Sequence, residues 1–187
     1  SGGTYTGNAD LTLYAQWTPV TYTVSYNANG GSGAPGNQAK VYDIDLTLSS
    51  TKPTRIGYTF VNWNTKADGT GTTYTSGALY KGNTALTLYA QWQPISYTIL
   101  FDGNGHTEGS TASMTMQYDE SKQLTENGFI KTNNRFTGWN TKADGSGTSY
   151  ANQQTVQNLS SVNGATMPDP GSIRKRSDST QPRSETR

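Results

Sequence analysis

The sequence predicts a β-rich α+β fold built from small tandem units. The heptapeptide LTLYAQW occurs twice, ending at Trp17 and again at Trp92, 75 residues later. Apolar and polar residues also alternate along several short segments. A fixed period of this length indicates stacked copies of one structural unit, and a period of two indicates strands with one buried face.

The repeats divide the 187 residues into four parts. We expect residues 1–17 to end in the closing strand of a preceding, truncated unit, and residues 18–92 to form a complete unit. Residues 93–166 form a second unit that lacks its closing strand, because Pro168 and Pro170 stand where that strand is expected. We interpret residues 167–187 as a disordered tail that is not native to the repeat.

The first predicted strand of each unit places aromatic and β-branched side chains on one face. They are Tyr22, Val24 and Tyr26 in the first unit and Tyr97, Ile99 and Phe101 in the second. Such side chains suit a half-buried pleated surface. Each strand is followed by an Asn-Gly pair, which tolerates positive φ and therefore predicts a turn.

The α part of the prediction comes from residues 43–50 and 119–126. In the second copy, Asp119 and Glu120 precede Ser-Lys-Gln-Leu, as acidic residues do in the first turn of a helix. In the first copy, Ile44, Leu46 and Leu48 alternate as in a strand. We expect one or two helical turns at this place, with a strand as the alternative.

The next predicted strand of each unit ends at a tryptophan. Trp63 and Trp139 each follow a phenylalanine by three residues, Phe60 and Phe136, and each begins the segment WNTKADG. Asp-Gly between β-prone residues predicts a hairpin-type turn. Large aromatic residues dominate small cores and interfaces, so we expect these two tryptophans in the cores, and Trp17 and Trp92 at the joints between units.

The links between units are short and contain proline. Residues 17–20 and 92–95 join one unit to the next with Pro19 and Pro94 inside them. Such links are stiff. Successive units should therefore keep a restricted relative orientation.

Three spaced motifs carry a family resemblance. Residues 22–31, 57–63 and 86–92 combine a Tyr-Thr-Val strand ending in Asn-Gly-Gly, a central Gly-Tyr-Thr-Phe-x-x-Trp, and Leu-Thr-Leu-Tyr-Ala-Gln-Trp. This combination resembles the Listeria–Bacteroides repeat, the B repeat of internalin-type surface proteins. The second copy departs from it with Asn133-Asn134-Arg135 in place of Gly57-Tyr58-Thr59.

The resemblance implies a small β-grasp, ubiquitin-like unit. It also implies a bacterial protein that is extracellular, at the cell surface or in the cell wall, where such repeats often lie between an adhesive domain and the wall. The family offers no catalytic residues to carry over, and we expect neither an enzyme nor a cofactor.

Composition excludes several other functions. The net charge of +1 is not the concentrated basic face that nucleic-acid binding needs. The absence of cysteine removes thiolate chemistry and disulfides. No run of 18 apolar residues is present, so we expect no membrane insertion.

The titratable residues offer weak candidates for chemistry. His106 is the single histidine and follows a turn, with no evident orienting partner. The carboxylates of Asp43 and Asp45 are two residues apart in the sequence, as a catalytic pair on one strand face could be. Asp119 and Glu120 in the second copy do not reproduce this spacing. Asp68 lies in a glycine-rich segment with half of a calcium loop's features, for which turn geometry is the simpler explanation.

The repeated aromatic residues leave two functions open. If they fill cores and joints, the array is a non-catalytic stalk or spacer, which we expect. If they are exposed and coplanar at equivalent places, a module that binds a glycan or a host surface component is the alternative. The expected partners are neighbouring units of the same protein, including self-association by exchange of the closing strand at residues 11–17.

Overall fold

The computed structural model describes residues 2–161 and 166–167 and is built from short strands. None of these residues lies in a helix, so the predicted α+β class, with β-grasp units, is wrong and the described chain is all-β. Asp43 and Asp119 adopt positive φ angles of 56° and 65°, which a right-handed helix does not allow. The two-residue strands β3 (Leu46–Thr47) and β11 (Lys122–Gln123) follow them.

The first unit, residues 18–94, is organised around one five-stranded sheet. Its strands are β1 (Thr21–Asn27), β2 (Gln38–Val41), β4 (Tyr58–Asn64), β5 (Thr73–Tyr74) and β7 (Leu86–Pro94), and their order is β2-β1-β7-β4-β5. The central strand β7 runs parallel to β1 and antiparallel to β4. Strand β3 pairs separately with β6 (Leu79–Tyr80).

The core of the first unit depends on β7. Leu88 and Ala90 on this strand are fully buried, and Ala90 lies opposite Trp63 of β4 in the register. Trp63 is itself fully buried. Edge-to-face contacts with Tyr26 and Phe60, at 5.0 and 5.1 Å between ring centroids, complete its surroundings.

The second unit has the same plan in smaller sheets. Its strands are β8 (Ser96–Ile99), β9 (Glu108–Gly109), β10 (Met114–Gln117), β11, β12 (Phe129–Ile130), β13 (Trp139–Asn140), β14 (Ser149–Tyr150), β15 (Thr155–Val156) and β16 (Thr166–Met167). They form the sheets β10-β8-β16, β11-β15, β12-β9 and β13-β14.

The closing strand explains the difference between the units. Ile99 pairs with Met167 as Val24 pairs with Leu86, so β16 stands at the start of the position that β7 fills in the first unit. β16 has two residues and β7 has nine. Because β4 pairs with β7 over its length, β4 has seven residues, whereas its counterpart β13 has two.

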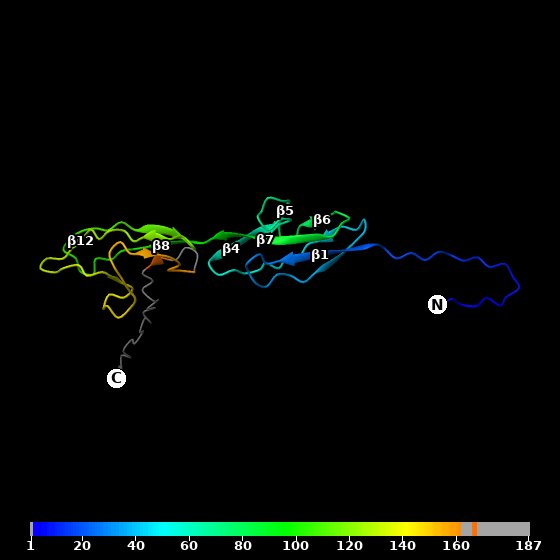
Figure 1. Cartoon of the computed structure of the whole chain (residues 1–187), viewed down its shortest axis with the longest axis horizontal. Helices are drawn as coiled ribbons and strands as arrows, with labels where there is room; N and C mark the ends of the chain where they lie inside the picture. Colours follow the sequence, from blue (N-terminus) through cyan, green and yellow to red (C-terminus); the bar gives the residue numbers. More distant parts are fainter. Residues whose placement is uncertain (1, 162–165, 168–187) are drawn as a thin grey trace, which may run out of the picture.

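Figure 1 shows the two units end to end along the long axis, with the N-terminal segment leading away from the first. Residues 2–20 of that segment contain no strand. Leu13, Tyr14 and Trp17 are 80% exposed or more. That this segment is the closing strand of another unit stays a prediction. The predicted disorder of residues 168–187 lies outside the described residues.

Candidate functional site: the joint between the units

Ile95 is the single residue between β7 of the first unit and β8 of the second. Its amide donates to the carbonyl oxygen of Gly57 at 3.0 Å, and its own carbonyl accepts from the amide of Tyr118 at 2.9 Å. Its side chain is 5% exposed. The connection is therefore bonded on one side to the first unit and on the other to the second, and both backbone groups are used.

Tyr58 makes the main side-chain contact across the joint. Its hydroxyl donates to the Asp119 carboxylate at 2.6 Å, and its ring meets that of Tyr118 edge-on at 5.7 Å. On the first unit's side, the Arg55 guanidinium lies 3.9 Å from the centre of the Tyr58 ring. A charge-assisted hydrogen bond, an aromatic pair and a cation–π contact thus meet at one residue.

Gly57 allows the second unit to come this close. It has a φ of 74°, and a Cβ atom added to it would lie 2.2 Å from the Tyr118 ring. Any side chain at this position would displace that ring. Its counterpart at the far end of the second unit is Asn133, with a φ of 59°, so the backbone shape is kept while the space is not.

The contact shifts the titration of both partners. The hydrogen bond from Tyr58, followed by one from the Asn158 amide, holds the pKa of Asp119 below its ordinary value of 3.8. The same bond to Asp119 is the main cause that raises the pKa of Tyr58 above 10.0. The joint is thus made by a neutral phenol and an ionised carboxylate.

A shallow groove runs along the joint. Its walls are Gly30, Gly31, Ser32, Thr54, Arg55, Ile56, Tyr58, Tyr118 and Asp119. The polar groups of Arg55, Tyr58 and Asp119 in this wall already contact one another. The groove therefore marks where the units meet, and its aromatic rings are engaged with each other.

The first unit carries an open copy of the second unit's side of this joint. Val20 accepts from the amide of Tyr42 at 2.9 Å, as Ile95 does from that of Tyr118. Tyr42 is 50% exposed. The neighbouring Asp43 is clamped by Asn83 through two hydrogen bonds, at 2.6 and 3.0 Å, as Asp119 is clamped by Asn158 at 2.8 and 2.6 Å.

An asparagine missed by the sequence analysis organises the turn in each WNTKADG segment. The Asn64 amide nitrogen donates to the oxygens of Gly69, Gly71 and Thr73, while its oxygen accepts from the amides of Lys66 and Gly71. Asn140 makes the equivalent five bonds in the second unit. The signal was in the sequence, since this asparagine is shared by both segments.

The repeated aromatic residues lie mainly inside the units. Tyr97 is 1% exposed, and Trp139 packs against the second core with Phe101 and Phe136 at 4.7 and 4.9 Å. The Trp92 indole donates to the carbonyls of Ala28 and Asn29 at 3.0 Å. Trp92 therefore closes a turn of its own unit, and its expected role at the joint stays a prediction.

The remaining aromatic markers divide between the cores and the free segment. Phe60 packs against the first core, Tyr22 is half-buried on β1, and Trp17 is 87% exposed on the N-terminal segment. No coplanar exposed pair at equivalent places is formed by these markers. These marker residues therefore do not themselves form a platform on which a sugar ring could stack.

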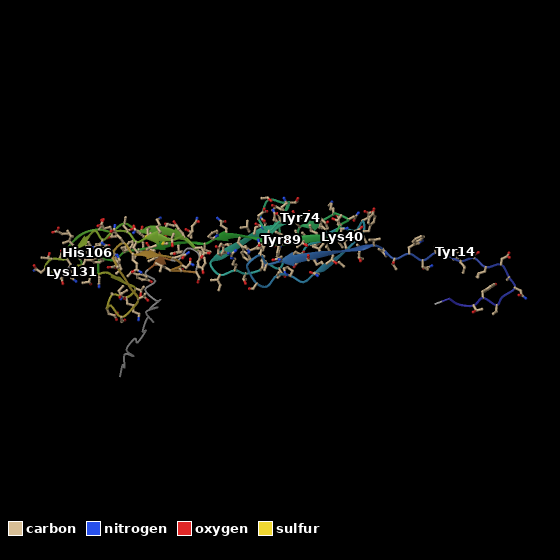
Figure 2. The ribbon with its side chains drawn as sticks, viewed as in Figure 1. Tyr14, Lys40, Tyr74, Tyr89, His106 and Lys131 are labelled. Carbon is tan, nitrogen blue, oxygen red and sulfur yellow. The ribbon has the colours of Figure 1, made fainter. Side chains whose placement is uncertain are left out.

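The titratable candidates have local partners. His106 lies over Phe129, with 4.6 Å between ring centroids, at the far end of the second unit, where it is labelled in Figure 2. Asp45 pairs with Lys81 at 3.5 Å, while Asp43 contacts Asn83. The two carboxylates thus serve different neighbours.

Asp68 takes part in its own turn. Its carboxylate accepts from the amide and hydroxyl of Thr70, and these bonds hold its pKa below the ordinary value. Asp144 has the same bond from the amide of Ser146. Within residues 2–161 and 166–167, no three His, Cys, Asp or Glu side chains gather as metal ligands would.

In the part of the chain that the structure describes, no helix has the length and apolar character needed to cross a membrane.

Comparison with known families finds the same repeat twice. The sequence profile of the Listeria–Bacteroides repeat domain matches residues 22–91 and again residues 97–166. This chain belongs to the Listeria–Bacteroides repeat family. The family resemblance seen in the motifs is thereby confirmed, and the two matched segments coincide with the two structural units. No solved structure matches the chain.

Three relatives place the Listeria–Bacteroides repeats within longer proteins. A protein of Evansella cellulosilytica named as a Gly-rich membrane protein is 38% identical over 114 residues, which is 57% of this chain and 13% of that protein. Another membrane protein of the same organism is 32% identical over 150 residues, 79% and 22% of the two chains. Internalin H of Listeria monocytogenes is 37% identical over 84 residues, 44% and 14%. The chain spans less than a quarter of each relative's length.

Proposed function

We propose that this chain is a non-catalytic spacer segment of a bacterial cell-surface protein. The observation that carries the proposal is the joint at Ile95, where one residue connects the units and both of its backbone groups are hydrogen-bonded across them. The Tyr58–Asp119 contact adds a second attachment away from the covalent link. Two attachments resist bending, and a stalk needs resistance to bending.

The family and the relatives support the setting of the proposal. Repeats of this family resemble those of internalin-type surface proteins, and two relatives are named as membrane proteins. The open copy of the joint at Val20, Tyr42 and Asp43 supports a spacer that has units on both sides. The partners that we propose are accordingly neighbouring repeats.

The placement of the aromatic rings supports a spacer over a ligand-binding module. Rings at equivalent positions fill the two cores, and those at the joint contact one another. The carboxylates are likewise engaged in turns, clamps and a surface ion pair. These contacts give the core and joint rings, and the carboxylates named, structural tasks.

Pulsed dipolar spectroscopy tests the spacer directly. The chain has no cysteine, so Thr23→Cys and Thr115→Cys place one spin label on an exposed strand position of each unit. We expect a narrow distance distribution, and a broader one after Tyr58→Phe, which removes the hydroxyl that binds Asp119. Tyr42→Phe removes a hydroxyl outside the joint and should leave the distribution narrow.

A broad distribution in the unmodified sequence would overturn the spacer. The same preparation on a glycan array tests the alternative, with Tyr58→Ala as the variant at the groove. Binding that this variant abolishes would replace the spacer by an adhesion module.

A further inference from the structure

Lys40, the third residue of β2, is a lysine with no exposed surface. Figure 2 shows it in the first unit, at the end nearer the N-terminal segment. Its ammonium donates to the Val41 carbonyl at 2.6 Å and to the Asn83 side-chain oxygen at 3.1 Å. Within the described residues it forms no ion pair. A buried charge without a counter-ion is unfavourable, whereas an amide at the same place carries none.

Asn83 is held in a position suited to reaction. Its side-chain oxygen accepts from Lys40 and also from the backbone amide of Asp43 at 3.0 Å. Its side-chain nitrogen donates to the Asp43 carboxylate at 2.6 Å. A nucleophile candidate, a donor at the carbonyl oxygen and a carboxyl group at the leaving nitrogen thus surround one amide.

We propose that Lys40 and Asn83 form an intramolecular isopeptide bond, with Asp43 as the catalytic residue. The Lys40 nitrogen bonds to Cγ of Asn83, and the bond from Cγ to Nδ2 breaks. The Asp43 amide stabilises the negative charge that develops on the carbonyl oxygen, and its carboxyl group transfers protons from Lys40 to the leaving nitrogen. An ammonium and a primary amide become a secondary amide and an ammonium ion, so atoms and charge balance.

The second unit provides an internal control. It keeps the clamp between Asp119 and Asn158 but has Met116, fully buried, in the place of Lys40. The clamp therefore does not need a lysine for its own geometry. In the first unit, Lys40 therefore places a nucleophile beside the Asn83 side-chain amide, which the clamp already holds in position.

The bond would join β2, at the edge of the main sheet, to the segment between β6 and β7. The two residues are 43 positions apart in the chain. A covalent link across a loop of this length restricts the unfolded chain, as a disulfide does. A chain without cysteine would gain by it a permanent cross-link that reduction cannot open.

Mass spectrometry of the purified full chain decides the proposal. We expect an intact mass lower than that of the sequence by one ammonia, and a branched tryptic peptide that joins Lys40 to Asn83. The peptide that holds Asn158 should be unmodified. A full intact mass after prolonged incubation of the folded chain overturns the proposal.

Three variants assign the roles. Lys40→Met copies the second unit and should restore the mass expected from its sequence. Asp43→Asn should slow or abolish the loss of ammonia, whereas Asp45→Asn, which removes a nearby carboxylate paired with Lys81, should not. Equal ammonia loss in Asp43→Asn and Asp45→Asn overturns the catalytic role of Asp43.

One side reaction gives the same mass and must be distinguished. Succinimide formation at an Asn-Gly pair such as Asn29-Gly30 also releases ammonia. It leaves Lys40 open to trypsin and persists in Lys40→Met. If the protein has lost ammonia but trypsin still cleaves after Lys40, the proposed isopeptide bond is wrong.

Discussion

Trp63 and Trp139 occupy equivalent positions and differ in burial. Trp63 is fully buried, whereas Trp139 is half-buried, although each packs against the phenylalanine three residues before it. The difference comes from the opposite strand, because Ala90 of β7 covers Trp63. Identical sequence at two sites thus gives unequal burial where the partner differs.

Replacing Trp63 with Ala should destabilise the first unit by about 3–5 kcal/mol, the usual loss for a buried large aromatic side chain. Trp139→Ala should cost less, because part of that side chain is already in water. Chemical denaturation followed by near-ultraviolet circular dichroism measures both. Equal losses for the two variants would contradict the role given to β7.

Asn64 should matter nearly as much as a core residue. Asn64→Ala removes five hydrogen bonds from the turn, including those to the backbone groups of Lys66, Gly69 and Gly71. The expected loss is on the order of 2–3 kcal/mol. Thermal unfolding measures it, with Asn62→Ala on the same strand as the control, since the Asn62 oxygen has no hydrogen-bond partner.

At the scale of the element, the strands were largely predictable and the class was not. Alternation in residues 21–26 and 86–92 located β1 and β7, because aromatic and β-branched residues face one buried side. The helix expected near Asp119 was wrong, because acidic residues also suit a turn with positive φ. The apolar alternation at Leu46 and Leu48 was the better signal.

The joint could be predicted only in outline. The short proline-containing link at residues 92–95 indicated a restricted orientation, but the contact of Tyr58 with Asp119 joins residues 61 positions apart. No local sequence pattern predicts a contact between residues this far apart in the chain. The clamp between Asp43 and Asn83 was hidden for the same reason, and the search for paired carboxylates drew attention to Asp45 instead.

A longer closing strand should stabilise the second unit. In the first unit, β7 pairs with both β1 and β4, whose counterparts in the second unit are β8 and β13. Placing the sequence of residues 87–92 after Met167 would supply β8 and β13 with the equivalent partner strand. We expect slower amide hydrogen exchange in β8 and β13. The same insertion with proline at its second and fourth positions removes ladder donors and is the matched control; equal protection in both would contradict the prediction.

At the scale of the whole molecule, the Tyr58–Asp119 contact that holds the two units together should weaken at both low and high pH. Because the pKa of Asp119 is lowered, its contribution to the stability of the joint is complete above pH 3.8 and is lost as the pH falls through the lowered pKa. Because the pKa of Tyr58 is raised, its contribution to the stability of the joint is complete below pH 10.0 and is lost as the pH rises through the raised pKa. The spin-label distances should therefore be narrow between about pH 5 and pH 9 and broaden outside that range.

Tyr58→Phe is the control for the alkaline change. This variant lacks the Tyr58 phenol that donates to Asp119, so its distance distribution should not change between pH 9 and pH 11 or so. An alkaline step that persists in Tyr58→Phe would assign the transition to another group.

The exposed N-terminal segment should promote association. Residues 11–17 repeat residues 86–92, so the segment of one chain can extend the sheet at β8 of another where β16 is short. We propose head-to-tail association that grows with concentration in static light scattering. Leu13→Asp should abolish it, because the counterpart Leu88 is fully buried, while Thr12→Asp should not, because Thr87 is exposed. A monomer at all concentrations would refute it.

The joint has two unlike halves, and this gives a chain of such units a direction. Gly57 and Tyr58 always belong to the earlier unit, and Tyr118 and Asp119 to the later one, so the contact is heterologous and extends as an open series. In the second unit, Asn133 and Asn134 occupy the donor positions, and neither can supply the vacant space or the phenol. We therefore expect a joint that has Gly-Tyr at these two positions to resist bending more than a joint that has Asn-Asn there.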